Sequence, residues 1–91
     1  MSVKVRIPTQ LRALAGGAGE VEVEGTTVGE ALKALDAAHP GFAERLFDDN
    51  GDLRRFVNVF MGEEDIRFLD GLGTPVPAGV VVSVVPAVAG G

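Results

Sequence analysis

The feature that most limits the possible folds is one well-capped amphipathic helix in a chain otherwise patterned for strands. Thr27 is followed three residues later by Glu30, the capping-box spacing that starts a helix. One apolar stripe follows, made of Val28, Ala31, Leu32, Leu35 and Ala38. Pro40 predicts that the helix ends near His39. Because the helix is apolar on one side only, we expect it to cover one face of a sheet.

Alternating apolar and polar residues on both sides of this helix predict the strands of that sheet. The expected strands are residues 3–7, 20–24, 55–61, 66–68 and 80–85, with a turn at 62–65. Short helical segments are expected at 10–15 and 42–47, with a loop over 69–79. In the expected strand 55–61, Val57, Val59 and Met61 share one side. In the last strand, Val82 and Val84 should point inward.

The order of elements is therefore β-β-α-β-(β)-β, within a chain of 91 residues. Two long apolar strands, one near each terminus, suit the centre of a mixed sheet. This arrangement is an α+β roll of the ubiquitin-like type, with one main helix on one face. We expect a single domain over residues 1–85, followed by a flexible tail over residues 86–91.

Composition excludes several classes of function. The chain has no cysteine, and His39 is its only histidine, so thiol nucleophiles, thiolate metal sites and histidine-dependent triads are not expected. The net charge is −5, with Lys4 and Lys33 as the only lysines. Nucleic acid is therefore an unfavoured partner, and a protein with a basic surface is a better one.

The hydropathy pattern gives no reason to expect a membrane protein. No apolar run approaches the 18 or more residues that a transmembrane helix needs. The first residues alternate apolar and charged side chains and lack the apolar stretch of a secretory signal. We therefore expect a cytoplasmic location without a membrane association.

The last six residues form a tail of small side chains that ends in Gly90 and Gly91. Glycines lose much backbone entropy on ordering, but they pass through channels too narrow for other residues. We expect Pro86 to end the last strand, because it has no N–H for a ladder hydrogen bond. Fully extended, the tail spans about 20 Å. Val88, its one bulky side chain, sets register in a partner's pocket or serves as a spacer, and a frayed terminus is the plain alternative.

Two other segments look like binding motifs but lack the required spacing. Residues 48–52 are rich in aspartate, yet the glycine and the twelfth position of a calcium loop do not match. Gly71-Leu72-Gly73 is followed by prolines rather than by a helix start, which excludes a phosphate-binding loop. We expect no metal site.

An apolar patch is expected on the sheet face that the helix does not cover. If Val57, Val59 and Met61 fill the core, then Phe56 and Phe60 lie on the opposite face. Val81, Ser83 and Val85 join them from the last strand. Exposed patches of this kind mark partner sites. The alternative is that the segment 42–47 covers them.

The chain as a whole resembles the ubiquitin-like sulfur-carrier proteins, the ThiS and MoaD group. The residues that carry the resemblance are 3–8, 27–32, 55–59, the acidic turn with its continuation at 63–68, and 84–91. Within the group it is most similar to carriers of a cysteine-synthesis route. A terminal Gly-Gly alone is a weak motif, but the β-grasp order and the Pro-x-Val-x-Gly-Gly ending together are specific.

The resemblance implies a function as a sulfur donor that is not itself an enzyme. An ATP-dependent E1-like activating enzyme adenylates the Gly91 carboxylate, and a sulfur donor then displaces AMP to leave a thiocarboxylate. Val88, Ala89 and Gly90 occupy the enzyme's channel, and no cofactor is held by the carrier. Partners implied are the activating enzyme, a synthase that accepts sulfur for cysteine or a metabolite such as a thiosugar, and a metalloprotease that processes the tail. The alternatives are the small subunit of molybdopterin synthase and a protein modifier.

Overall fold

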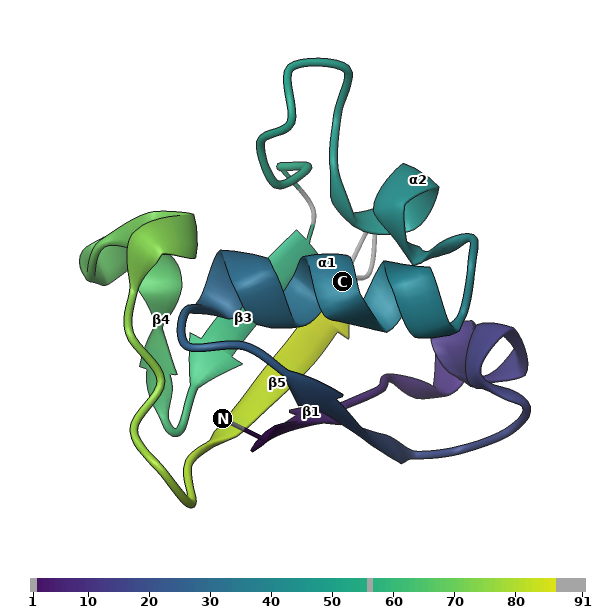
Figure 1. The fold of residues 1–91 in the computed structure, drawn as a ribbon. Coiled ribbons are helices and arrows are strands. Elements are labelled where there is room, and N and C mark those ends of the chain that lie inside the picture. The colour runs from purple at the N-terminus through teal and green to yellow at the C-terminus, as the bar shows by residue number, and fades with distance from the viewer. Residues whose placement is uncertain (1, 56, 87–91) are drawn as a thin grey trace.

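The computed structural model describes residues 2–55 and 57–86 and has two layers, a five-stranded sheet and the helices that cover one face of it (Figure 1). The strands are β1 (Ser2–Arg6), β2 (Glu20–Glu24), β3 (Val57–Met61), β4 (Glu64–Asp65) and β5 (Val81–Pro86). The helices are α1 (Val28–Ala38) and α2 (Phe42–Leu46), with 3₁₀ segments η1 (Thr9–Ala15), η2 (Ile66–Phe68) and η3 (Gly71–Gly73). This architecture confirms the expected α+β roll.

The sheet has the strand order β2-β1-β5-β3-β4, so the strands nearest the two termini are adjacent. β1 pairs antiparallel with β2, which confirms the first hairpin, and parallel with β5. β5 pairs antiparallel with β3 on its other side. β5 is paired with β1 over Val81–Ser83 and with β3 from Val82 to Pro86, and in the sequence it leads directly into the C-terminal tail.

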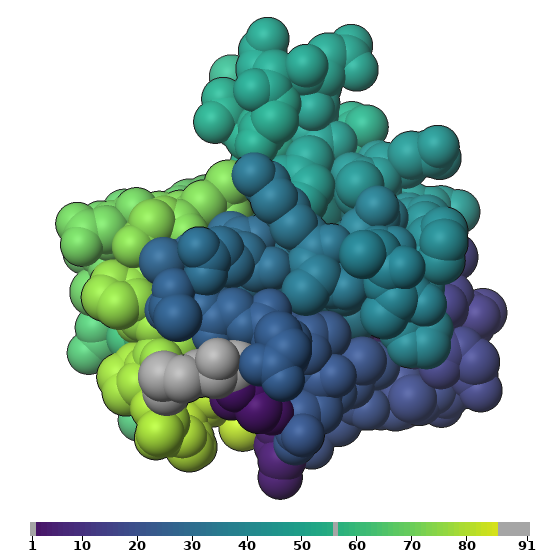
Figure 2. All heavy atoms as spheres, viewed as in Figure 1, coloured from purple at the N-terminus to yellow at the C-terminus, as the bar shows by residue number. Residues whose placement is uncertain are grey.

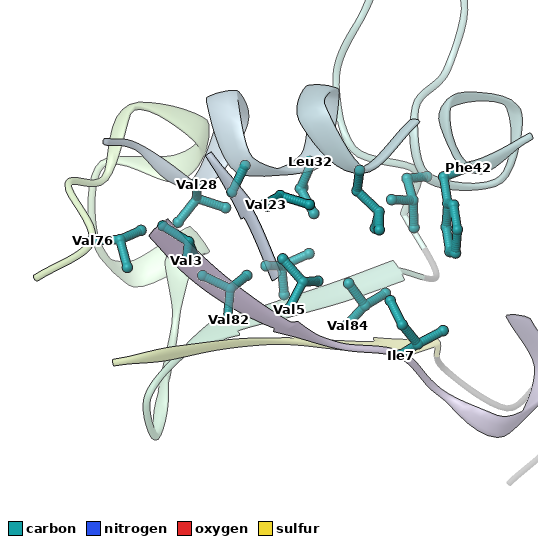
Figure 3. Packing of buried hydrophobic residues seen from close by; sticks show 14 of the residues in the cluster. Val3, Val5, Ile7, Val23, Val28, Leu32, Phe42, Val76, Val82 and Val84 are labelled. Atoms are coloured by element: carbon teal, nitrogen blue, oxygen red, sulfur yellow. The ribbon is translucent and has the colours of Figure 1, made fainter. Parts of the chain in front are cut away.

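The core lies between the sheet and α1 (Figure 3). Val5, Val82 and Val84 point from the central strands toward Val28 and Leu32 of the helix, and all five are at most 3% exposed. The inward direction expected for Val82 and Val84 is confirmed, as is that of Val57 and Val59, while Met61 is partly buried against the same core. Burial of such side chains contributes about 1.5–3 kcal/mol each to folding.

The start of α1 has the expected cap in a slightly extended form. Thr27 is the N-cap, and its Oγ1 accepts a hydrogen bond from the Glu30 backbone N–H at 3.2 Å. The Glu30 carboxylate reaches back one residue further than expected and accepts from the N–H and the hydroxyl of Thr26, each at 2.8 Å. These two bonds from Thr26 lower the pKa of the Glu30 carboxyl below its ordinary value.

The end of α1 joins it directly to α2. His39 is the C-cap, as expected. The Asp36 carboxylate accepts from the N–H groups of Gly41 and Ala43 at 3.2 and 2.8 Å, so a side chain of α1 caps α2. Ala38, expected in the apolar stripe, is exposed because α1 ends there without an element above it.

The expected strand at 66–68 is wrong. The return strand is β4, which lies directly before the expected segment. It follows a turn at Gly62 and Glu63, in which Gly62 has a positive φ of 65°. Residues Ile66–Phe68 form η2 because the Asp65 carboxylate accepts the Arg67 N–H at 2.9 Å and bends the chain out of the strand. Ile66 is fully buried, and alternation alone did not distinguish this anchored turn from a strand.

The other boundaries differ by a few residues, and one loop contributes to the core. β3 begins at Val57, and β5 begins at Val81 and continues to Pro86. The loop after η3 lies against the start of α1, where Val76 N–H donates to Thr26 at 2.9 Å. Val76 is therefore 4% exposed, although the sequence predicted only a loop there.

The segment between α2 and β3 stands out from the compact body, at the top of Figures 1 and 2. It is closed by a bridge between Phe47 and Leu53. Within the described ranges, no helix has the length and apolar character needed to cross a bilayer.

Candidate functional site

The expected reactive group is at the end of the chain, and the structure describes the strand that leads to it. Gly91 and the channel residues Val88, Ala89 and Gly90 lie outside the described residues, as does Phe56. β5 reaches Pro86, the last described residue, where Pro86 pairs with Val57 of β3. We call this end of the sheet, made of Arg54, Val57, Asn58, Val85 and Pro86, the tail root.

At the tail root, the backbone groups of Val57 face away from β5, as those of every second residue in an antiparallel pair do. Val57 donates its N–H to the Arg54 carbonyl at 3.0 Å, and its carbonyl accepts from Arg67 Nη2 at 2.8 Å. Pro86 has no N–H to donate. Both backbone groups of Val57 thus have partners outside β5, so the Val57–Pro86 pair is held by the position of the chain before β3.

Arg67 organises this part of the chain, and the sequence analysis missed it. Its Nη1 donates to Asn58 Oδ1 at 2.6 Å. Its Nη2 donates to the carbonyls of Arg54 and Arg55 at 3.1 and 3.2 Å, in addition to Val57. The one available sequence signal is Asp65 two residues before Arg67, a spacing typical of a turn closed by an aspartate side chain.

The sheet face opposite α1 presents the expected patch in part. Phe60 and Val81 are half-buried there, and Val85 is 44% exposed. Phe60 pairs with Ser83, which itself pairs with Arg6, so these three side chains lie in one row across the face. The alternative, cover by residues 42–47, is excluded for the described patch residues because Phe42 and Leu46 are fully buried in the core on the helix side.

A shallow groove of about 480 Å³ crosses this open face beside the tail root. Phe60 and Val85 supply its apolar walls, and Arg6 and Arg12 supply its charge. Arg12 is oriented by a hydrogen bond from Nε to the Ile7 carbonyl at 3.1 Å. The groove therefore offers an apolar floor with a cationic side, immediately next to the last residues of β5.

Charge on the open face is arranged in columns that follow the strands. Glu20, Glu22 and Glu24 are the outward residues of β2, and Lys4 and Arg6 are those of β1. In register, Arg6 is opposite Glu20 and their charged atoms are 3.8 Å apart, with both side chains largely exposed. Exposed pairs of this kind add little stability, so their main effect is on the orientation of an approaching partner.

The remaining candidate sites have structural roles. Asp48 Oδ1 accepts the backbone N–H groups of Asn50 and Asp52 at 2.9 and 3.1 Å, so this carboxylate closes its own loop. Gly71–Gly73 forms η3, which packs against α1. In residues 2–55 and 57–86, no cluster of histidine, aspartate and glutamate side chains is arranged to hold a metal ion.

Comparison with known proteins agrees with this geometry. The model of the ThiS family matches residues 5–91. The sulfur carrier protein CysO of Mycobacterium tuberculosis is 45% identical over 93 residues, which cover the whole of both chains.

Two solved structures extend the comparison to the fold. The Amycolatopsis orientalis BexX/CysO complex contains a chain that is 43% identical, with a TM-score of 0.91, covering 98% of this chain and 99% of that one. Small archaeal modifier protein 1 of Haloferax volcanii is 32% identical, with a TM-score of 0.81, covering 96% and 98%. With a β-grasp sheet, a one-sided helix layer and a family match that runs through the terminal Gly-Gly, this chain belongs to the ThiS family.

Proposed function

We propose that this protein is a sulfur carrier whose reactive group is the C-terminal carboxylate of Gly91. The observation that carries the proposal is the position of β5, the central strand of the sheet between β1 and β3, because the tail follows it in the sequence. The full-length likeness to a protein named as a sulfur carrier supports the same function. The carrier itself performs no catalysis in this proposal, which fits a chain without cysteine and with one histidine.

The chemistry begins with activation, because a carboxylate is a poor electrophile. An oxygen of the Gly91 carboxylate attacks the α-phosphorus of ATP on an activating enzyme, and pyrophosphate leaves. The sulfur of a donor then attacks the carbonyl carbon of the acyl-adenylate, and AMP leaves with the electron pair of the broken C–O bond. The product is a thiocarboxylate, ionised and nucleophilic at neutral pH, which a second enzyme uses as a sulfur source.

The body of the protein presents this group and holds no cofactor of its own. The tail root gives the tail a defined starting point, and six residues from Pro86 onward reach about 20 Å. The open face, with Phe60, Val81 and Val85, is the docking surface for the activating enzyme in this proposal. Its apolar groove buries hydrophobic surface on docking, and the charge columns of β1 and β2 favour one orientation.

The test is intact-mass spectrometry of the protein after incubation with ATP, a cognate activating enzyme and a sulfide source. We expect a mass increase that corresponds to the replacement of one oxygen by sulfur, and no increase when ATP is omitted. An unchanged mass, under conditions in which a CysO protein from Mycobacterium reacts, would contradict the proposal.

A protein modifier is a second candidate, favoured by the likeness to small archaeal modifier protein 1. In that case the Gly91 carbonyl forms an isopeptide bond with lysine side chains. Denaturing gels of cells that express a tagged form would then show conjugates of higher mass that disappear when Gly91 is deleted. A single band of the free protein would exclude the modifier function and leave the carrier function as the remaining candidate.

The proposal also includes the compound that finally receives the sulfur. Cysteine is the product that we favour, because the relative with 45% identity is a CysO protein. A sulfur-containing metabolite such as a thiosugar is the alternative. A gene for a cysteine synthase-like enzyme or a tail-processing metalloprotease beside this one would favour cysteine.

A further inference from the structure

We propose that Arg67 is a positioning residue for the reaction, because it holds the start of β3 and, through it, the point at which the tail leaves the sheet. The inference rests on the proposed sulfur-carrier function and assigns a role to a residue that lies on η2, outside the tail and the open face. It follows from three features. The edge of β3 at the tail root has no neighbouring strand, the Arg67 side chain binds the backbone there, and the pairing of β3 with β5 transmits the effect to β5.

The uncovered edge is the outer side of the tail root. β5 occupies one side of β3 along its whole length, from Val57 to Met61. On the other side, the described part of β4 pairs with Phe60 and Met61 only. The carbonyls that precede this short pairing need other partners, because an open edge of backbone groups is poorly held and invites pairing with foreign chains.

The guanidinium of Arg67 supplies these partners in the place of a strand. It donates to Asn58 Oδ1 and to the carbonyls of Arg54, Arg55 and Val57, over distances of 2.6–3.2 Å. A guanidinium carries five N–H donors in a rigid planar fork, so one side chain bridges several acceptors at once. A lysine ammonium retains the charge but donates from one nitrogen only, so it cannot replace both the Nη1 contact with Asn58 and the Nη2 contacts with the three carbonyls.

Arg67 is itself held firmly at its backbone. Its N–H donates to Asp65 Oδ1 at 2.9 Å, and the preceding residue, Ile66, is fully buried in the core. The fork therefore extends from an anchored turn rather than from a mobile loop. This is why the irregular segment after β4 replaces the strand expected there.

The pairing of β3 with β5 transmits this order to the tail. Asn58 pairs with Val85, and Val57 pairs with Pro86. Because Pro86 donates no hydrogen bond and the N–H of Val57 is bonded to Arg54, the Val57–Pro86 pair exchanges no ladder hydrogen bond, and its position depends on where β3 is held. A displaced root changes the point from which the tail extends, and small misplacements of a reacting group reduce rates strongly.

The first measurement uses the free protein and needs no partner enzyme. We compare Arg67→Gln and Arg67→Lys with Arg45→Gln, a control that removes one exposed charge from α2. In amide hydrogen exchange, both Arg67 variants should exchange about tenfold faster at Asn58 and Val85, while the amides of Phe60 and Val82 stay protected. Unchanged exchange at Asn58 and Val85 would overturn the proposal.

The second measurement separates positioning from docking. In ATP-dependent thiocarboxylation, we expect the Arg67 variants to lower kcat about three- to tenfold, with KM for the carrier within about twofold of the parent. Arg45→Gln should change neither. A rise of KM with unchanged kcat would place Arg67 in the docking surface instead, and unchanged kcat and KM would make its role purely structural; either result overturns the proposal.

A third variant covers the case in which Arg67→Gln does not fold. Asn58→Ala removes one acceptor of the fork and retains Arg67, so a smaller change in the same direction is expected at Val85 and in kcat. If Arg67→Gln does fold, the double variant should be less than additive. A parent protein that gains no sulfur would overturn the proposed function, whereas the exchange measurement would still decide whether Arg67 holds the tail root.

Discussion

The two faces of the sheet come from the same strands but serve different purposes. On the helix side, alternate residues of the central strands are almost fully buried, with Val5 and Val82 at 0% and Val84 at 3% exposure. On the open side, their neighbours remain accessible, and Val85 is 44% exposed. A period of two along each strand thus divides one sequence into a surface that maintains the fold and a surface that can meet another protein.

This difference between the two faces indicates where substitutions should affect stability and where they should affect function. The covered face contributes most of the folding free energy, because burial there excludes water from one continuous cluster. The open face contributes less to stability, and its exposed residues are available for recognition. The following predictions test whether stability and function separate along this division.

The largest expected effect is on the tail. One residue appended after Gly91 replaces the terminal carboxylate by a peptide bond at the reacting carbon, so sulfur transfer should fall below detection while the thermal midpoint stays unchanged. Intact-mass spectrometry and thermal denaturation measure the two quantities. The matched control carries the same extra residue before Met1 and should react like the parent; retained transfer in the C-terminal variant would show that Gly91 is not the reacting end.

The covered face is tested by Leu32→Ala in α1. Leu32 is fully buried, so the substitution removes packing and leaves a cavity, at a cost of about 2–5 kcal/mol in the free energy of unfolding. Lys33→Ala, the exposed neighbour on the same helix, should change it by less than about 0.5 kcal/mol. Denaturant unfolding measures both. Equal losses for the two variants would mean that the helix is not held by the core.

The open face is tested by Phe60→Ala. If this face docks the activating enzyme, KM for the carrier should rise about tenfold, which corresponds to about 1.4 kcal/mol of binding. Phe68→Ala is the control, because Phe68 is 87% exposed but lies on η2 rather than on the sheet. An equal rise for both variants would remove the distinction between the open face and the rest of the surface.

The smallest expected effect is a pH dependence at the start of α1. Hydrogen bonds from Thr26 lower the folded-state pKa of Glu30 below the ordinary value of 4.5. A lowered pKa stabilises the fold above the unfolded-state pKa, and this contribution is lost as the pH falls through the folded-state pKa. Glu30→Gln should therefore be less stable than the parent near pH 7 and converge with it in strong acid. A pH-independent difference would exclude the ionised carboxylate as the cause.

Much of the fold was predictable because its signals are local. The cap at Thr27 and Glu30, the hairpin of β1 with β2 and the inward direction of Val82 and Val84 each follow from a few neighbouring residues. Of the partner patch, Phe60, Val81 and Val85 were placed on the open side by the same alternation. Phe56 and the tail residues remain predictions, since they lie outside the described residues.

The failures came from contacts between residues that are far apart in the sequence. Val76 is buried because its loop crosses the start of α1, more than 40 residues earlier in the chain. Residues 66–68 alternate like a strand but form a turn, in which Ile66 joins the core cluster built from distant parts of the chain. A local pattern carries no information about the core partners of Val76 or Ile66.

The sequence by itself determined most of the element types, the covered and open faces of the central strands, and the candidate reactive carboxylate, because periodicity, capping and composition are properties of neighbouring residues. Only the tertiary structure decided that β5 lies between β1 and β3 and that Arg67 reaches back over nine to thirteen residues to hold the tail root. The physical reason is that backbone carbonyls at a strand edge require donors, and which side chain supplies them depends on how the whole chain packs.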